Sequence, residues 1–290
     1  MDSFFTSHFN QSVIVSSFAN VRCELYLVQL LKDKKIVVVK PVSDKESDIH
    51  EALCYDALVG DDVKHPNILG VEESIWLPGV RRALVLEHAA GGTLFDMIWD
   101  DEEYLDKQEV ARIFKSLVSA VAWCHDQCVI HNDIKPENIF LTSQGEVRLA
   151  DFGGAVWSFE ENMQSAARTR LYVAPEVFAN QKKYDEGVDV WSLGVALFEL
   201  VWRMHPFFTN NKILHMQDDL TLSRATKKIR DKVMTCSGPI FPNGLSPDPI
   251  DAEFWAHQDE ELKDLVRGML KKNPKKRLSC EEVLHHVWLK

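Results

Sequence analysis

The spacing of apolar residues along the chain predicts two regions of different secondary structure. In the first 90 residues, apolar and β-branched residues form continuous runs of strand length, at 21–30, 34–42 and 81–89. After the Ala-Ala-Gly-Gly segment at 89–92, apolar residues instead recur every three or four positions, which is the period of a helix. We therefore expect a strand-rich part followed by a larger helical part.

One helix is expected within the strand-rich part. The segment 43–60 places four apolar residues at roughly helical spacing, and these are Ile49, Ala52, Leu53 and Leu58. Gly60 is a natural stop for this helix, because glycine readily adopts the left-handed conformation that follows many helices.

Longer helices are expected in the second part. The first begins after Asp106, which together with Glu109 resembles a capping box. Further periodic segments follow at about 187–202, 260–271 and 280–289. The last of them opens with Ser279 and Glu282, again at the spacing of a capping box.

Composition supports a substantial buried core. The chain has 290 residues, of which 46% are hydrophobic, enough for one large domain or two modest lobes. The longest apolar stretch, 190–202, is too short to span a bilayer and contains Glu199, so a buried helix is expected there. The N-terminus lacks the pattern of a signal peptide, so we expect an intracellular protein, cytoplasmic or nuclear, with no membrane partner.

Charge and cysteine content exclude some classes of protein. The chain carries 33 basic and 44 acidic side chains, a net charge of −11, which argues against a general nucleic-acid-binding surface. Its six cysteines form no Cys-x-x-Cys pair and show no zinc-site spacing. They are therefore expected to be reduced thiols.

The stretch His-Asn-Asp-Ile-Lys-Pro-Glu-Asn at 131–138 carries the main candidate chemistry. Phosphoryl transfer to a hydroxyl requires an acceptor for the departing proton, a cation near the phosphate, and oxygen ligands for Mg²⁺. Asp133, Lys135 and Asn138 supply these groups within one loop. Taken alone, the string favours an ordinary polar turn, but Asp151 in the segment 150–154 offers the second oxygen ligand that magnesium needs.

Six motifs occur in a particular order, VVVK, HNDIKPEN, DFG, APE, DVWSLG and NPKKRLS. In this order the chain resembles a eukaryotic protein kinase catalytic domain from about residue 12 to the C-terminus. The resemblance implies an α+β, two-lobed fold in one domain over 1–290. A small β-rich N-lobe with one main helix (1–88) would be joined by a hinge (89–92) to a larger, mostly helical C-lobe (93–290), and ligands bind in clefts between such lobes.

The resemblance also implies a role for each motif residue. Asp133 resembles the catalytic aspartate that receives the proton of the substrate hydroxyl, and Lys135 resembles the lysine that steadies the γ-phosphate. Asn138 and Asp151 resemble the two magnesium ligands, and Lys40 the strand lysine that holds the α- and β-phosphates of ATP.

The strand lysine needs an acidic partner on the following helix. Glu51 is the preferred partner of Lys40, because Tyr55 and Leu58 then take the offsets at which this helix buries apolar residues in the family. Glu46 and Glu72 are the alternatives.

Two further features follow from the resemblance. Leu86 would be the gatekeeper before Glu87, and His88 and Ala89 would offer hinge backbone groups to the adenine, so Glu87 and Ala89 are expected to contact the nucleotide. In the C-lobe, Glu176 and Arg277 resemble a buried structural ion pair of the family.

The chain departs from the family pattern in two places. The region that would hold a glycine-rich turn, 15–23, contains no glycine, and the first glycine of the chain is Gly60, so weaker nucleotide affinity or a displaced loop is expected. Asn132 stands where the family most often has arginine. Since asparagine cannot gather a phosphate as arginine does, activity is expected not to depend on phosphorylation of 155–171.

The leading hypothesis is a Ser/Thr protein kinase that uses ATP and Mg²⁺ on protein substrates. Thr169 supports this substrate class, because it resembles the threonine that bridges the catalytic aspartate and lysine in Ser/Thr-directed enzymes. The alternative is a pseudokinase that serves as a binding or scaffolding module, which the glycine-free region favours. A small-molecule kinase is disfavoured, because APE and DVWSLG belong to the lobe that binds protein substrates.

The sequence identifies no regulatory partner. The Pro- and Gly-rich segment 208–258 has the least pattern of the second part, and partner contacts are expected there first. An ordinary long connection is the competing interpretation of this segment.

Overall fold

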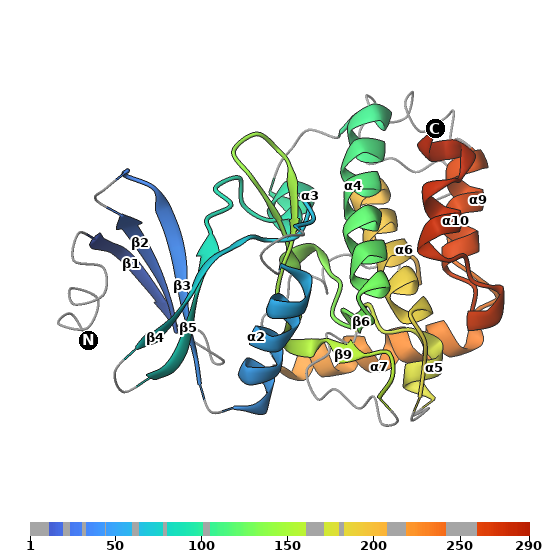
Figure 1. Cartoon of the computed structure of the whole chain (residues 1–290). Coiled ribbons are helices and arrows are strands. Elements are labelled where there is room, and N and C mark those ends of the chain that lie inside the picture. Colours follow the sequence, from blue (N-terminus) through green and yellow to red (C-terminus); the bar gives the residue numbers. More distant parts are fainter. Residues whose placement is uncertain are drawn as a thin grey trace.

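The computed structural model describes residues 12–19, 24–30, 33–43, 45–59, 64–77, 80–100, 105–160, 171–179, 183–207, 219–241 and 260–290. A small lobe of strands lies beside a larger lobe of helices, and helix α2 (Glu46–Leu58) stands between the sheet and the helices (Figure 1). The expected two-lobed α+β architecture is therefore confirmed.

The strands of the small lobe form one antiparallel sheet in the order β1-β2-β3-β5-β4. These strands are β1 (Ser12–Ala19), β2 (Glu24–Leu30), β3 (Ile36–Val42), β4 (Val71–Leu77) and β5 (Val80–Glu87). Both faces of the sheet are buried, because successive side chains along each strand point to opposite faces. On β5, Ala83 and Val85 join a small core with Val37 and Val39, while Leu84 on the opposite face joins the main core.

The hinge is tied to the helical lobe by backbone hydrogen bonds. Gly91 N donates to Leu141 O at 2.8 Å, and Leu141 N donates to Gly92 O at 2.9 Å. A Cβ at Gly91 would lie 2.3 Å from Thr142 O, and Gly92 has φ +78°, so both positions require glycine. The glycines at 91 and 92 thus allow the chain to pass closely over β7 (Ile139–Leu141).

The elements of the helical lobe follow in chain order: α3 (Leu94–Trp99), α4 (Lys107–Asp126), β6 (Val129–Ile130), β7, β8 (Val147–Leu149), β9 (Val156–Trp157), α5 (Pro175–Phe178), α6 (Gly187–Trp202), α7 (Asp219–Thr235), α9 (Glu260–Met269) and α10 (Cys280–Leu284). The predicted N-terminal caps are present. Asp106 accepts a hydrogen bond from Glu109 N at the start of α4, and Ser279 and Glu282 form a reciprocal capping box on α10.

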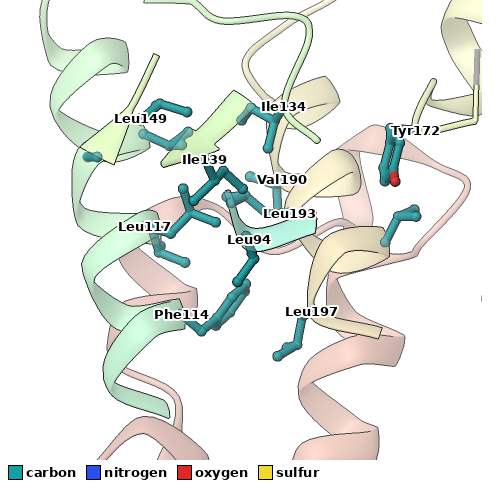
Figure 2. Packing of buried hydrophobic residues seen from close by; sticks show 14 of the residues in the cluster. Leu94, Phe114, Leu117, Ile134, Ile139, Leu149, Tyr172, Val190, Leu193 and Leu197 are labelled. Carbon is teal, nitrogen blue, oxygen red and sulfur yellow. The ribbon is translucent and has the colours of Figure 1, made fainter. Parts of the chain in front are cut away.

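Helix α6 is the centre of the large core. Every residue from Val188 to Trp202 is buried, because this helix is apolar on nearly all sides and is surrounded by other elements. Figure 2 shows Val190, Leu193 and Leu197 of α6 facing side chains of α4 such as Phe114, with residues of β7 and β8 above them. The loop between β6 and β7 therefore rests on a tightly packed support.

Two expectations about the helices are corrected, and the predicted stop at Gly60 stays a prediction. Helix α2 exposes Ile49 (41%) and Leu53 (50%), because its inward face presents Tyr55 and Cys54 instead. It ends at Leu58, and Gly60 lies outside the described residues. The predicted helix at 280–289 ends at Leu284 and is followed by a 3₁₀ turn, Val287–Leu289.

The segment 208–258 is more regular than expected in its described portion. Residues 219–235 form helix α7, whereas 208–218 and 242–258 lie outside the described residues. Within the part of the chain that the structure describes, none of the helices combines the length and the apolar character needed to cross a membrane.

Candidate functional site

The loop at 131–138 is held from below by a buried carboxylate on α6. Asp189 accepts hydrogen bonds from His131 N at 2.8 Å and from Asn132 N at 2.7 Å. His125 Nε2 lies 2.9 Å from the same carboxylate. Burial would lower the pKa of His125, but its hydrogen bonds to Asp189 and Cys280 raise it to about 10, so the ring is protonated at neutral pH. A charged, buried pair thus fixes the backbone just before Asp133.

Within the loop the three predicted side chains meet. Lys135 Nζ lies 2.9 Å from Asp133 Oδ2. The Asn138 amide nitrogen donates to Asp133 O at 2.9 Å and approaches Asp133 Oδ2 at 3.3 Å. Because the side-chain nitrogen of Asn138 makes these contacts, its side-chain oxygen remains able to coordinate a metal ion. A 3₁₀ turn at Pro136–Asn138 produces this short spacing.

Asp151 begins a tight turn whose next residue is deeply buried. Phe152 is fully buried and packs against Tyr55 of α2 at a ring-centroid distance of 5.1 Å and against His131 at 4.8 Å. Asp151 itself has the left-handed backbone conformation, with φ 66°. The aromatic contacts therefore anchor the residue next to Asp151 between α2 and the loop.

Lys40 and Glu51 form an ion pair between β3 and α2. Lys40 Nζ lies 2.7 Å from Glu51 Oε1 and 2.6 Å from Oε2. Burial raises the pKa of Glu51, the charge of Lys40 lowers it, and the charge of Asp151 adds to the increase. Among the three acidic candidates the structure places Glu51 beside Lys40, whereas Glu72 pairs with Lys35 at 2.7 Å.

The carboxylates of Asp151 and Glu51 lie near each other. A Cβ built on Gly153 would lie 3.3 Å from Asp151 Oδ1 and 3.6 Å from Glu51 Oε2, so both acids border the space beside this glycine. The turn at 151–153 and the ion pair of Lys40 are therefore parts of one site. The site draws on both lobes.

The structure gives Glu87 a part in joining the lobes. Its carboxylate accepts hydrogen bonds from Arg148 Nε at 3.0 and 3.1 Å and from Gly70 N at 3.2 Å. Leu86 is buried, and Ala89 is partly buried. The expected adenine contacts of Glu87 and Ala89 stay predictions.

The predicted structural ion pair in the helical lobe is present. Arg277 reaches Glu176 with two hydrogen bonds, of 2.6 and 2.9 Å, although 101 residues separate them in the sequence. Arg277 also donates to Gly187 O at 2.6 Å and lies over the ring of Trp191. Both charged side chains are almost completely buried.

The donor set fits a magnesium ion that is shared with nucleotide phosphates. Asn138 and Asp151 offer hard oxygen atoms, which magnesium prefers, and one or two protein ligands suffice when phosphate oxygens complete the shell. In the portion of the chain with described coordinates, no group of three or more His, Cys, Asp or Glu side chains could hold a metal alone.

Some functional positions were not predicted from sequence, and others lie outside the described residues. Asp189 opens the DVWSLG motif, and His131 opens the loop, but their supporting contacts join residues 57 and 58 positions apart and give no local signal. Thr169 and residues 20–23 of the glycine-free region are not described.

Comparison with known proteins agrees with this geometry. The family model described as protein kinase domain matches residues 20–289. The chain therefore belongs to the protein kinase family.

Curated relatives cover most of this chain. Aurora kinase C of Mus musculus is 30% identical over 269 residues, which is 92% of this chain and 86% of the relative. Aurora kinase A-B of Xenopus laevis is 31% identical over 275 residues, 94% of this chain and 59% of the relative. The SNF-related serine/threonine-protein kinase of Homo sapiens is 34% identical over 229 residues, 78% of this chain and 26% of the relative. The chain is thus similar to protein kinases, including a Ser/Thr kinase, and spans only part of two of these relatives.

Proposed function

We propose that this protein kinase transfers the γ-phosphate of Mg·ATP to serine or threonine hydroxyls of protein substrates. The observation that carries the proposal is the cluster of Asp133, Lys135 and Asn138, with contacts of 2.9 Å to Asp133, on a loop fixed by Asp189. Positioning and electrostatic stabilisation supply most of the catalysis in phosphoryl transfer, and a rigid loop provides both.

Each side chain has a distinct part in this scheme. Asp133 would accept the proton of the attacking hydroxyl as the new oxygen–phosphorus bond forms and the bond to the ADP oxygen breaks. Lys135, held beside Asp133, would offset negative charge on the transferred phosphate. Lys40, oriented by Glu51, would hold the α- and β-phosphates, and Glu87 and Ala89 would border the adenine.

Asn138 and Asp151 would hold magnesium through their oxygen atoms. When bound, the ion supplies positive charge that neutralises the phosphate oxygens. The left-handed conformation of Asp151 and the buried side chain of Phe152 support this role, because they hold the carboxylate on a fixed turn.

We also propose that residues 1–290 form one kinase domain, with the N-lobe at 1–88, the hinge at 89–92 and the C-lobe at 93–290. The hydrogen bonds of Gly91 and Gly92 to β7 support this division. An intracellular location, cytoplasmic or nuclear, suits an ATP-dependent enzyme, and Cys54, Cys124 and Cys280 are buried free thiols.

A pseudokinase is the second candidate, favoured by the absence of glycine before Gly60. Transfer of radiolabelled phosphate from ATP to a basic protein, compared between the wild type and Asp133→Ala, separates the two functions. We expect labelling of serine or threonine by the wild type alone. Equal signals from both proteins would remove the kinase proposal, and binding of a partner without transfer would support the pseudokinase.

A further inference from the structure

Asn132 makes a side-chain contact that links two loops of the candidate site. Its amide nitrogen donates a hydrogen bond to Gly154 O at 3.0 Å, and its own backbone N–H is held by Asp189. The residue is buried, with 8% of its surface exposed. Asn132 therefore joins the loop of Asp133 to the turn that begins at Asp151.

The neighbouring histidine makes an equivalent contact at the other end of the same turn. His131 Nε2 lies 3.1 Å from Ala150 O, and its Nδ1 accepts a hydrogen bond from Asp133 N, so Nε2 is the donor. Two consecutive residues thus bind the carbonyl groups on either side of Asp151, at Ala150 and at Gly154. We call this pair of contacts the turn clamp.

Asparagine suits this position for two physical reasons. Residue 132 has φ 67°, a conformation that asparagine adopts more readily than most residues other than glycine. Its side chain is short and uncharged, and the amide N–H donates the hydrogen bond that the Gly154 carbonyl accepts. A buried carbonyl left without a donor would be unfavourable, so the bond opposes movement of the turn away from the loop.

The clamp acts where the chain leaves the site. Two residues after Gly154, β9 begins and pairs with β6 through Val156 opposite Ile130 and Trp157 opposite Val129. Asn132 is the second residue after β6, so the clamp continues this ladder towards Asp151. The turn is consequently held on one side by strand pairing and on the other by the packing of Phe152.

We propose that Asn132 is a positioning residue for phosphoryl transfer, which clamps the 150–154 turn and so fixes Asp151 relative to Asp133 without the help of a phosphate. This inference rests on the proposed kinase function. The bond is between uncharged groups, so it is made in the unmodified chain. At the position where the family most often has an arginine, which commonly gathers a phosphorylated loop, this chain has an asparagine that makes an internal hydrogen bond.

Two substitutions at this position test the clamp. Asn132→Gly keeps the backbone conformation and removes the donor, and Asn132→Asp keeps the shape and removes the donor. Asn67→Asp is the matched control, because the Asn67 amide also donates to a backbone carbonyl, Val147 O at 3.1 Å, away from the reacting groups.

We expect both Asn132 variants to lower kcat roughly tenfold while KM for ATP changes by less than about threefold, because the loss falls on alignment for transfer. Hydrogen exchange of the backbone amides at 152–157 should become faster in both. Asn67→Asp should leave kcat within about twofold of the wild type and the exchange at 152–157 unchanged.

Either of two results would overturn the inference. One is a kcat within about twofold of the wild type in both Asn132 variants, or a loss no larger than that of Asn67→Asp. The other is unchanged exchange at 152–157. If the wild type transfers no phosphate, the kinase function fails, and the exchange comparison still decides whether Asn132 holds the turn.

Discussion

Lys40 Nζ lies 2.6 Å from Glu51 Oε2, which joins strand β3 to helix α2 through a pair of largely buried charges. The contact orients a cation on the middle strand of the N-lobe sheet, and we propose that this cation binds the nucleotide phosphates. Glu51 also lies close to Asp151, so movement of α2 would disturb two parts of the site at once.

The first prediction concerns this ion pair. Lys40→Met should lower the rate of phosphate transfer by about 100-fold or more, because it removes the cation that we propose holds the nucleotide phosphates. Lys35→Met is the matched control, since Lys35 forms a similar pair with Glu72 at 2.7 Å on the surface, with 45% of its side chain exposed. Transfer rates measured with saturating ATP check both variants, and equal losses would contradict the role of Lys40.

The second prediction concerns stability. Removing one partner of the buried Glu176–Arg277 pair should lower the free energy of unfolding by roughly 3–5 kcal/mol, because an uncompensated charge would be left in the core. Urea unfolding of Glu176→Ala measures this loss. Arg112→Ala, which breaks an exposed pair with Glu109, should cost about 1 kcal/mol or less. An equal loss of unfolding free energy in both variants would contradict the claim that burial makes the Glu176–Arg277 pair more costly to break.

The third prediction concerns pH. Burial raises the pKa of Glu199 from 4.5 to about 8, against the hydrogen bond from Tyr172, which lowers it. Between these values the folded state keeps a proton that the unfolded state has released. This contribution to the free energy of unfolding is therefore fully present below pH 4.5. It decreases as the pH rises above 4.5 and is lost once the pH has passed about 8.

Glu199→Gln removes this dependence while it keeps an acceptor for Tyr172. Between pH 4.5 and about pH 8, the free energy of unfolding of the wild type should fall relative to that of the variant by at most about 1.4 kcal/mol per pH unit, and its Tm should fall with it. Thermal unfolding monitored by circular dichroism checks the difference. Parallel pH curves for the two proteins would show that Glu199 is ionised in the folded state.

The fourth prediction concerns nucleotide affinity. The region 15–23 has no glycine, and a Cβ at each position limits how closely the backbone can approach phosphate. Mg·ATP should therefore bind with a Kd weaker than micromolar in titration calorimetry. A micromolar or tighter Kd would mean that other contacts compensate for the missing glycines.

Much of the site could be predicted because its residues lie close together in sequence. Asp133, Lys135 and Asn138 fall within one short loop, and the order of the motifs identified the family and the fold. The long helices α4 and α6 were also correctly placed, because the apolar spacing of α4 matches its buried face and the apolar run of α6 matches a helix that is buried throughout.

The remaining features depend on tertiary contacts that the sequence pattern does not contain. Ile49 and Leu53 of α2 fit a helical spacing, yet they are exposed to solvent. The inward face of α2 is fixed instead by Tyr55, which packs against Phe152, and by Glu51, which pairs with Lys40. The bond of Asn132 to Gly154 spans 22 residues and depends on how two loops meet. The asparagine at position 132, where the family most often has arginine, showed that this position is unusual. The sequence did not show that its side chain would bind Gly154 O.

The central claim is that Asp133 accepts the proton in phosphoryl transfer, and the most direct measurement is the single-turnover rate of phosphate transfer by Asp133→Asn. Asp106→Asn is the matched control, because asparagine also caps a helix well and Asp106 caps α4 away from the site. Asp133→Asn should be slower than the wild type by about 100-fold to 10,000-fold, and Asp106→Asn should match the wild type. A rate for Asp133→Asn equal to that of Asp106→Asn would contradict the account.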